Sequence, residues 1–226
     1  MSENIRVAID GPSGAGKSTL ARSVAARLNF LYVDTGAIYR TIGYAVWRKG
    51  IDPRDRSAVV AVLPDLEICL TYGTDGLQHM ELNGMDVTAE IRLPEVSRYA
   101  SLVSAYPEVR AYLLEMQRQL ARENSVVMDG RDIGTVVLPD ATVKIFLTAS
   151  PEARAARRWK EYQEKGVNTP YEEVLADVKQ RDYQDTHRAA APLKQAEDAV
   201  LLDTSELDFE QSLAAMKKII AEKVKN

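Results

Sequence analysis

The sequence predicts an α/β fold with about five parallel strands, helices on both faces of the sheet, and one small antiparallel insert. Short apolar, β-branched runs such as residues 5–10 alternate with segments of helical periodicity. A glycine-rich loop joins the first of these strands to the first helix. Between residues 64 and 91 the pattern changes to two-residue alternation around Asn83-Gly84, which is a strong hairpin signal.

The individual elements follow from the same patterns. Buried parallel strands are expected at residues 5–10, 30–33, 125–128, 142–147 and 199–202. Helices are expected at residues 19–28, after residue 34, at 94–104, at 107–123, from 150, from 171 until Pro192 stops it, and at 209–224. The insert is expected to contain strands near residues 66–72, 77–82 and 85–87.

Residues 11–18 read Gly-Pro-Ser-Gly-Ala-Gly-Lys-Ser and fit the phosphate-loop pattern. Glycines let several backbone N–H groups approach one polyphosphate, and the following helix adds its positive dipole end. Lys17 is expected to reach the β- and γ-phosphates, and the Ser18 hydroxyl to ligate Mg²⁺. The alternative is a chance match of a Gly/Ser-rich turn, which the flanking strand and helix disfavour.

The second strand delivers residues 34–40 to the same edge of the sheet as the phosphate loop. Asp34 or Thr35 can cap the helix that follows. Arg40 is then a candidate ligand for a second phosphate group. An arginine on a solvated helix face is the other interpretation.

Residues 129–132, Asp-Gly-Arg-Asp, place three charges directly after a predicted buried strand. An ordinary surface turn can have this composition. Charges at this position of a phosphate-loop fold more often face the ligand cleft, which favours a functional loop.

Arg154, Arg157 and Arg158 are spaced i, i+3, i+4 on one predicted helix, so three guanidinium groups share a face. The face is either solvated or closes over the phosphates of the ligand. We call these three residues the arginine face.

Arg181, Asp185 and Arg188 fall at i, i+4, i+7 on the next helix and also share a face. Ion pairs within that helix would explain them without a ligand. The guanine and γ-phosphate motifs of GTPase switches, Asn-Lys-x-Asp and Asp-x-x-Gly, are both missing from the sequence. Arginine groups in addition to Lys17 favour a transferase with a second anionic substrate.

Composition limits the remaining classes. The 226 residues carry a formal charge of −4, which disfavours nucleic-acid binding through a basic field. One cysteine, Cys69, excludes an internal disulfide, and His79 and His187 lie too far apart to suggest a zinc site. No apolar run is long enough to cross a bilayer, and the first strand leaves no room for a signal peptide, so a cytoplasmic protein is expected.

Four motifs in this order resemble the bacterial-type cytidylate kinases: residues 11–18, 34–40, 129–135, and 181–188 followed by Ala191-Pro-Leu193. The resemblance spans nearly the whole chain. It implies a nucleoside-monophosphate-kinase fold, phosphoryl transfer from ATP to CMP or dCMP, dependence on Mg²⁺, and a mobile lid. We expect a monomer whose partners are these nucleotides, without nucleic acid or membrane.

The resemblance also implies how the chain is divided. We expect a single kinase unit over residues 1–226, with a core at 1–35, 92–150 and 189–226. The monophosphate-binding region would span about 35–105 and contain the insert at about 64–91. The lid would span about 151–170.

Site residues carry over by position. The resemblance implies that ATP is bound by Gly11, Pro12, Ser13, Gly14, Ala15, Gly16, Lys17, Ser18, Thr19, Arg154, Arg157 and Arg158. It implies that CMP is bound by Thr35, Tyr39, Arg40, Ser101, Arg110, Arg131, Asp132, Arg181, Asp185 and Arg188. Within the second set, Tyr39, Arg40 and Arg131 lie near the phosphate, Ser101, Arg110 and Asp132 read cytosine, and Arg181 and Asp185 hold the sugar.

The chemistry implied is direct in-line transfer, in which positioning and charge neutralisation replace a dedicated base. Lys17, Arg131 and Arg181 would neutralise the transferring group, and Asp129 would lie near Mg²⁺ or the phosphates. The alternatives within enzymes are a UMP, AMP or shikimate kinase. The alternative in another class is a non-catalytic ATP-binding module.

Overall fold

The computed structural model describes residues 4–74 and 76–224, so Asp75, in an expected turn of the insert, lies outside the described residues. The chain forms two compact units. The first unit runs through Tyr32 and resumes at Ala121, and the second spans Val33–Leu120.

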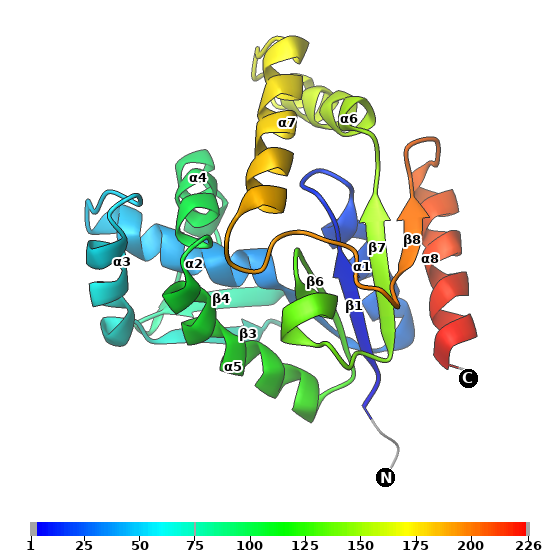
Figure 1. Cartoon of the computed structure of the whole chain (residues 1–226), viewed down its shortest axis with the longest axis horizontal. Coiled ribbons are helices and arrows are strands. Elements are labelled where there is room, and N and C mark those ends of the chain that lie inside the picture. The colour runs from blue at the N-terminus through cyan, green and yellow to red at the C-terminus, as the bar shows by residue number, and fades with distance from the viewer. Residues whose placement is uncertain (1–3, 75, 225–226) are drawn as a thin grey trace. The chain divides into compact units, whose positions relative to one another are not determined.

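The first unit is built on a five-stranded sheet with the strand order β2-β6-β1-β7-β8 (Figure 1). Its strands are β1 Arg6–Asp10, β2 Leu31–Asp34, β6 Val126–Gly130, β7 Val143–Thr148 and β8 Val200–Asp203. β1 pairs in parallel with both β6 and β7, and β7 pairs in parallel with β8. The prediction of a parallel α/β sheet is confirmed.

Helices α1 Lys17–Leu28 and α8 Phe209–Val224 cover one face of this sheet (Figure 1). Apolar side chains that alternate along β1, such as Val7 and Ile9, are fully buried in the core that these helices share. The opposite face of β1 meets a single π-helical turn at Ile133–Val137. The polar residue at the end of β1, Asp10, points to that side and bonds the turn.

Two further helices, α6 Pro151–Glu164 and α7 Tyr171–His187, pack against each other in the first unit (Figure 1). Their small apolar cluster contains Ala155, Val174 and Val178. Ser150 caps α6 by accepting a hydrogen bond from the N–H of Ala153. Within the described ranges, no helix combines the length and apolar character needed to cross a bilayer.

The second unit consists of helices and the small antiparallel sheet. Its elements are α2 Thr35–Arg48, α3 Arg56–Val62, η1 Leu63–Asp65, β3 Ile68–Tyr72, β4 Gln78–Leu82, β5 Met85–Asp86, η2 Glu90–Arg92, α4 Pro94–Val103 and most of α5 Pro107–Glu123. The sheet has the order β3-β4-β5. Asn83 and Gly84 have φ values of 50° and 76° between β4 and β5, so the predicted two-residue hairpin is confirmed.

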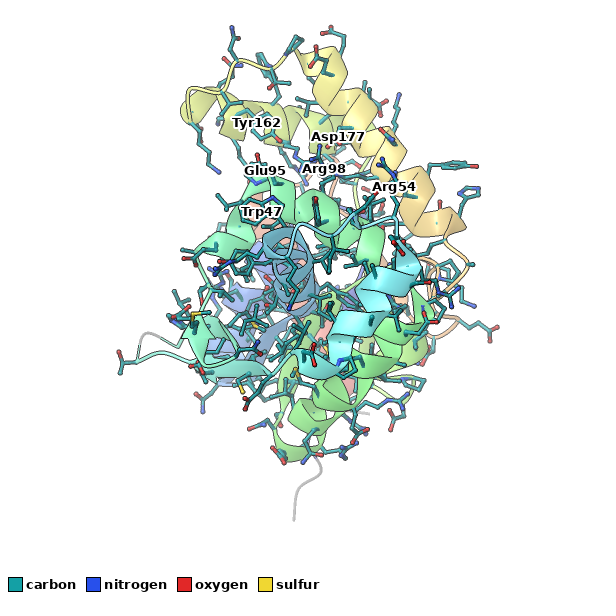
Figure 2. All side chains as sticks on the ribbon, turned by 90° about the vertical axis from the view of Figure 1, so that its left-hand side faces the viewer. Trp47, Arg54, Glu95, Arg98, Tyr162 and Asp177 are labelled. Atoms are coloured by element: carbon teal, nitrogen blue, oxygen red, sulfur yellow. The ribbon has the colours of Figure 1, made fainter. Side chains whose placement is uncertain are left out.

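Helices α2 and α4 pack closely in the second unit. Figure 2 labels Trp47, near the end of α2, and Glu95, near the start of α4. Gly43 lies at their closest approach, where an added Cβ would stand 2.7 Å from the backbone N of Ala100 and 3.1 Å from the carbonyl O of Val96. A side chain at residue 43 would therefore push the helices apart.

Two local differences from the sequence prediction have clear causes. α7 ends at His187 instead of continuing to Pro192, because Arg188 turns to an extended conformation and Ala191 has a φ of 48°. As a result Arg188 does not lie on the helix. The other difference is α3, which periodicity did not reveal and whose first turn is capped by Asp55. The predicted division into core, monophosphate-binding region and lid stays a prediction.

We expect Gly43→Ala to lower the free energy of unfolding by about 1–3 kcal/mol, because the new methyl group meets backbone atoms that cannot rotate away. Urea denaturation followed by circular dichroism measures this change. Lys49→Ala, at the exposed C-cap of the same helix, is the control and should change stability by less than about 0.5 kcal/mol. Equal stability of the two variants would contradict this account of the helix contact.

Candidate functional site

The backbone of the phosphate loop depends on three glycines. Gly11 has a φ of 152°, and a Cβ there would lie 1.8 Å from the carbonyl O of Leu147, so no other residue fits. Gly14 and Gly16 have φ values of 76° and 85° in the left-handed region. Gly16 is also the N-cap of α1 and provides no side-chain cap, which leaves the first-turn N–H groups available to an anion.

Lys17 is buried, with 5% of its surface exposed, and its Nζ donates to the carbonyl O of Pro12 at 2.7 Å. Burial lowers the pKa of the Lys17 ammonium to about 7. The positive charge of Arg131 acts in the same direction, and the carboxylate of Asp129 opposes it. The ammonium is thus held at the loop in an environment that favours a phosphate partner.

Ser18, next to Lys17 of the phosphate loop, is hydrogen-bonded to Asp129 of β6. The Ser18 hydroxyl donates to Oδ2 of Asp129 at 2.9 Å, and the Tyr32 hydroxyl donates to the other carboxylate oxygen, also at 2.9 Å. Asp129 is 4% exposed. A hydroxyl and a carboxylate are hard oxygen donors that fit Mg²⁺. Sequence reasoning missed Tyr32, although a tyrosine inside a buried strand needs a partner for its hydroxyl.

Asp10 connects the strand before the phosphate loop to the turn after Asp132. Its two carboxylate oxygens accept hydrogen bonds from the backbone N–H groups of Ile133 and Gly134, both at 2.7 Å. Burial raises the pKa of the Asp10 carboxyl to about 6, and the two hydrogen bonds oppose this shift. Sequence reasoning missed Asp10, though it ends a buried strand as Asp129 does.

The loop of residues 129–132 meets the end of α7. The Nε of Arg131 donates to Asp185 at 2.7 Å, and a guanidinium nitrogen of Arg188 lies 3.6 Å from a carboxylate oxygen of Asp132. Arg188 also donates from Nε to the carbonyl O of Ala191 at 2.7 Å. Asp185 therefore binds an arginine of another element, and the intrahelical ion pairs considered above do not explain it.

Asp177 of α7, labelled in Figure 2, pairs with two arginines to which the resemblance assigns roles in nucleotide binding. Its carboxylate lies 3.0 Å from Arg158 of α6 and 3.3 Å from Arg181, one turn along α7. Tyr162, also labelled there, has its ring 5.9 Å from the guanidinium carbon of Arg158. Sequence reasoning missed Asp177.

The other two arginines of the arginine face bind the protein itself. Arg154 is 2% exposed and donates to the carbonyl oxygens of Ser13 and Ala149 at 3.0 and 2.8 Å. It also forms a bidentate pair with Asp182 of α7 at 2.9 and 2.5 Å. Arg157 donates to the carbonyl O of Thr204 at 2.5 Å. The three arginines thus lie in different environments, and a common solvated face does not describe them.

A pocket of about 360 Å³ in the first unit borders the phosphate loop. Its lining includes Pro12 of the loop, Thr148 at the end of β7, Arg154, and Asp182 of α7. The pocket therefore adjoins residues expected to bind ATP.

In the second unit, the segment after β2 is organised by Asp34. One carboxylate oxygen caps α2 by accepting from the N–H of Ala37 at 2.9 Å, and the other accepts from Arg40 at 2.8 Å. Gly36 makes room for this pair, because a Cβ there would lie 2.9 Å from a guanidinium nitrogen of Arg40. Thr35 is 3% exposed beside them. Arg40 is held by an ion pair and is not a freely solvated side chain.

The second unit also brings together Tyr39 and Arg110, with the guanidinium carbon 5.3 Å from the centre of the ring. Arg110 is 9% exposed and donates to the carbonyl O of Ser104 at 3.1 Å. The Ser104 hydroxyl in turn donates to the carbonyl O of Ser101 at 3.0 Å. These contacts link Tyr39, Arg110 and Ser101, three residues of the predicted CMP set, within the second unit.

We expect Asp182→Ala to lower the free energy of unfolding by about 3 kcal/mol, because it leaves the buried Arg154 guanidinium without its carboxylate. Chemical denaturation measures the loss. Asp177→Ala is the matched control on the same helix: its pair with Arg158 is more exposed, 46% and 22% by side chain, and should contribute less than about 1 kcal/mol. If both substitutions lower the free energy of unfolding by the same amount, burial does not control the strength of these ion pairs.

Comparison with known proteins places these features in one family. Residues 7–222 match the family model described as cytidylate kinase. A protein named cytidylate kinase from Caldicellulosiruptor bescii is 46% identical over 99% of this chain and 99% of its own length. One of the same name from Desulfitobacterium hafniense is 48% identical over 99% of this chain and 96% of its own length.

Among solved structures, a shikimate kinase from Bacteroides thetaiotaomicron matches with a TM-score of 0.49 and 15% identity, over 96% of this chain and 98% of that one. That likeness is too weak to indicate a substrate. The match over residues 7–222 and the near-full-length relatives show that this chain belongs to the cytidylate kinase family.

Proposed function

We propose that this protein transfers the γ-phosphoryl group of ATP to CMP, and to dCMP, by direct in-line transfer. The observation that carries the proposal is the family match over residues 7–222, which includes the phosphate loop, the loop of residues 129–132 and the end of α7. The relatives are named for this activity at 46% and 48% identity.

On the donor side, the phosphate loop and Lys17 would bind the polyphosphate of ATP. Ser18 and Asp129 would hold Mg²⁺, because their oxygens already lie 2.9 Å apart at the start of α1. When bound, the ion supplies neutralisation of charge on the β- and γ-phosphates. Thr19 and the three arginines of α6, Arg154, Arg157 and Arg158, complete the proposed donor site.

On the acceptor side, Arg131 of the first unit and Tyr39 and Arg40 of the second would bind the phosphate of CMP. Arg181 would hold the sugar and neutralise the transferring group. Arginine suits this role because its planar guanidinium binds two phosphate oxygens at once and stays charged. In the described residues each of the three arginines is bonded to an aspartate, so each is oriented before the substrate binds.

The base would be read by Asp132, Arg110 and Ser101. A buried carboxylate such as Asp132, 3% exposed, accepts from the N4 amino group of cytosine, and donors on Arg110 and Ser101 match N3 and O2. Uracil reverses two of these partners and leaves buried groups unpaired, which penalises UMP strongly.

The remaining residues would bind the sugar and close the site. Asp185 would accept from a ribose hydroxyl, with Arg188 beside the base or phosphate and Thr35 at the mouth of the acceptor site. Closure of the segment at about 151–170 would exclude water, which would otherwise accept the phosphoryl group. No dedicated base is needed, because positioning and charge neutralisation provide most of the rate.

An acceptor panel tests this proposal. Purified protein with ATP and Mg²⁺ is assayed for ADP release with CMP, dCMP, UMP, AMP and shikimate. We expect kcat/KM for CMP and dCMP to exceed that for UMP by a factor on the order of 10⁴, because a site built to hydrogen-bond one base edge rejects its inverse. Turnover of UMP, AMP or shikimate without CMP would overturn the proposal. ATP hydrolysis unaffected by any acceptor would indicate a non-catalytic ATP-binding module.

The low pKa of Lys17, about 7, gives a second prediction. Near pH 8 the Lys17 side chain of the free protein is mostly the neutral amine. A bound polyphosphate raises the pKa of this group, so ATP binding should be accompanied by the uptake of about one proton. Affinity should therefore decrease as pH rises above about 7. Isothermal titration calorimetry in buffers of different ionisation enthalpy measures the uptake. Lys17→Met is the control that removes it, and a binding enthalpy independent of buffer would contradict the prediction.

A further inference from the structure

The side-chain amide of Gln78, the first residue of β4, binds the backbone of Asp34 at the end of β2. Its Oε1 accepts from the N–H of Asp34 at 2.8 Å, and its Nε2 donates to the carbonyl O of the same residue at 3.2 Å. Nε2 also contacts Sδ of Met80 at 3.2 Å. All three residues belong to the second unit.

The Gln78 amide forms the two hydrogen bonds to the Asp34 backbone that a neighbouring strand would otherwise form. β2 is an edge strand of the five-stranded sheet, so within the described part of the chain its outer N–H and C=O groups face no further strand of that sheet. A primary amide offers one donor and one acceptor side by side, which matches one peptide group of a strand. The two bonds to Asp34 fix which end of the amide is oxygen.

Asp34 is the residue that holds Arg40. Its carboxylate spans the N–H of Ala37 and the guanidinium of Arg40, at 2.9 and 2.8 Å. Rotation of the Asp34 peptide would move both oxygens and, with them, the guanidinium. Two bonds to the main chain at residue 34 therefore control the side chain at residue 40.

We propose that Gln78 is a positioning residue for the acceptor phosphate, and that the antiparallel insert serves to place it. Gln78 holds Asp34, Asp34 holds Arg40, and Arg40 binds the phosphate of CMP. The proposal rests on the proposed function for the last of these steps only.

The experiment compares three single variants. Gln78→Met keeps the length of the side chain and removes both hydrogen bonds. Gln78→Glu keeps the acceptor for the N–H of Asp34 but sets an oxygen against its carbonyl. His79→Ala is the control, because His79 is the next residue of β4 and its ring contacts Asp86 within the insert.

For Gln78→Met we expect KM for CMP to rise about tenfold, with kcat and KM for ATP within about twofold of the wild type, because only acceptor binding is affected. Gln78→Glu should have a similar effect, and His79→Ala should match the wild type. Thermal unfolding of each variant shows whether the insert remains folded. The proposal would be overturned if the loss of CMP affinity in a variant matched its fraction of unfolded protein. It would also be overturned if KM for CMP and KM for ATP rose equally.

A double-mutant cycle with Arg40→Met tests whether Gln78 affects CMP binding through Arg40. Once Arg40 is absent, removing Gln78 should change KM for CMP no further. Full additivity would overturn the proposal, since Gln78 would then act independently of Arg40. If Arg40→Met left KM for CMP unchanged, the proposal would also fail, whereas phosphorylation of CMP by the wild type would still support the proposed function.

Discussion

Paired charge is the constraint on which the first unit depends. Guanidinium groups that lie close together repel one another, and a buried one without a counter-ion is strongly unfavourable. Three aspartates of α7, Asp177, Asp182 and Asp185, meet this cost by pairing with arginines of α6 and of the loop after β6 and, in one case, of α7 itself. These carboxylates fix the orientation of the arginines with which they pair.

Two buried carboxylates, those of Asp10 and Asp129, lie at or near the ends of neighbouring strands. The register that pairs Asp10 with Gly130 and Ile9 with Asp129 brings two carboxylates to one edge of the sheet. One fixes the turn after Asp132, and the other fixes the Ser18 hydroxyl. Because strand pairing is rigid, these contacts are set by the fold of the sheet and do not depend on a flexible loop.

The sheet, most helices and the phosphate loop were predictable because each leaves a local signal: an apolar run, a period, or a glycine pattern. The partners of the charged residues were not. The arginine face illustrates this, since equal spacing on α6 gave no sign that Arg154 would be buried against Asp182 while Arg157 bonds Thr204. Those differences arise from tertiary packing between segments distant in sequence. The early end of α7 has the same origin, because the N–H of Leu193 bonds back to Asp185.

The contact between β4 and the end of β2 shows why a side chain can replace a strand. Asp34 is the last residue of β2 and also the N-cap of α2, so the chain turns from strand to helix at one peptide unit. One side-chain amide satisfies the single peptide group at this turning point without a further strand. Gln78 meets this requirement at a separation of 44 residues. The antiparallel insert can thus be understood as a support for Asp34, the N-cap of α2, and through it for Arg40.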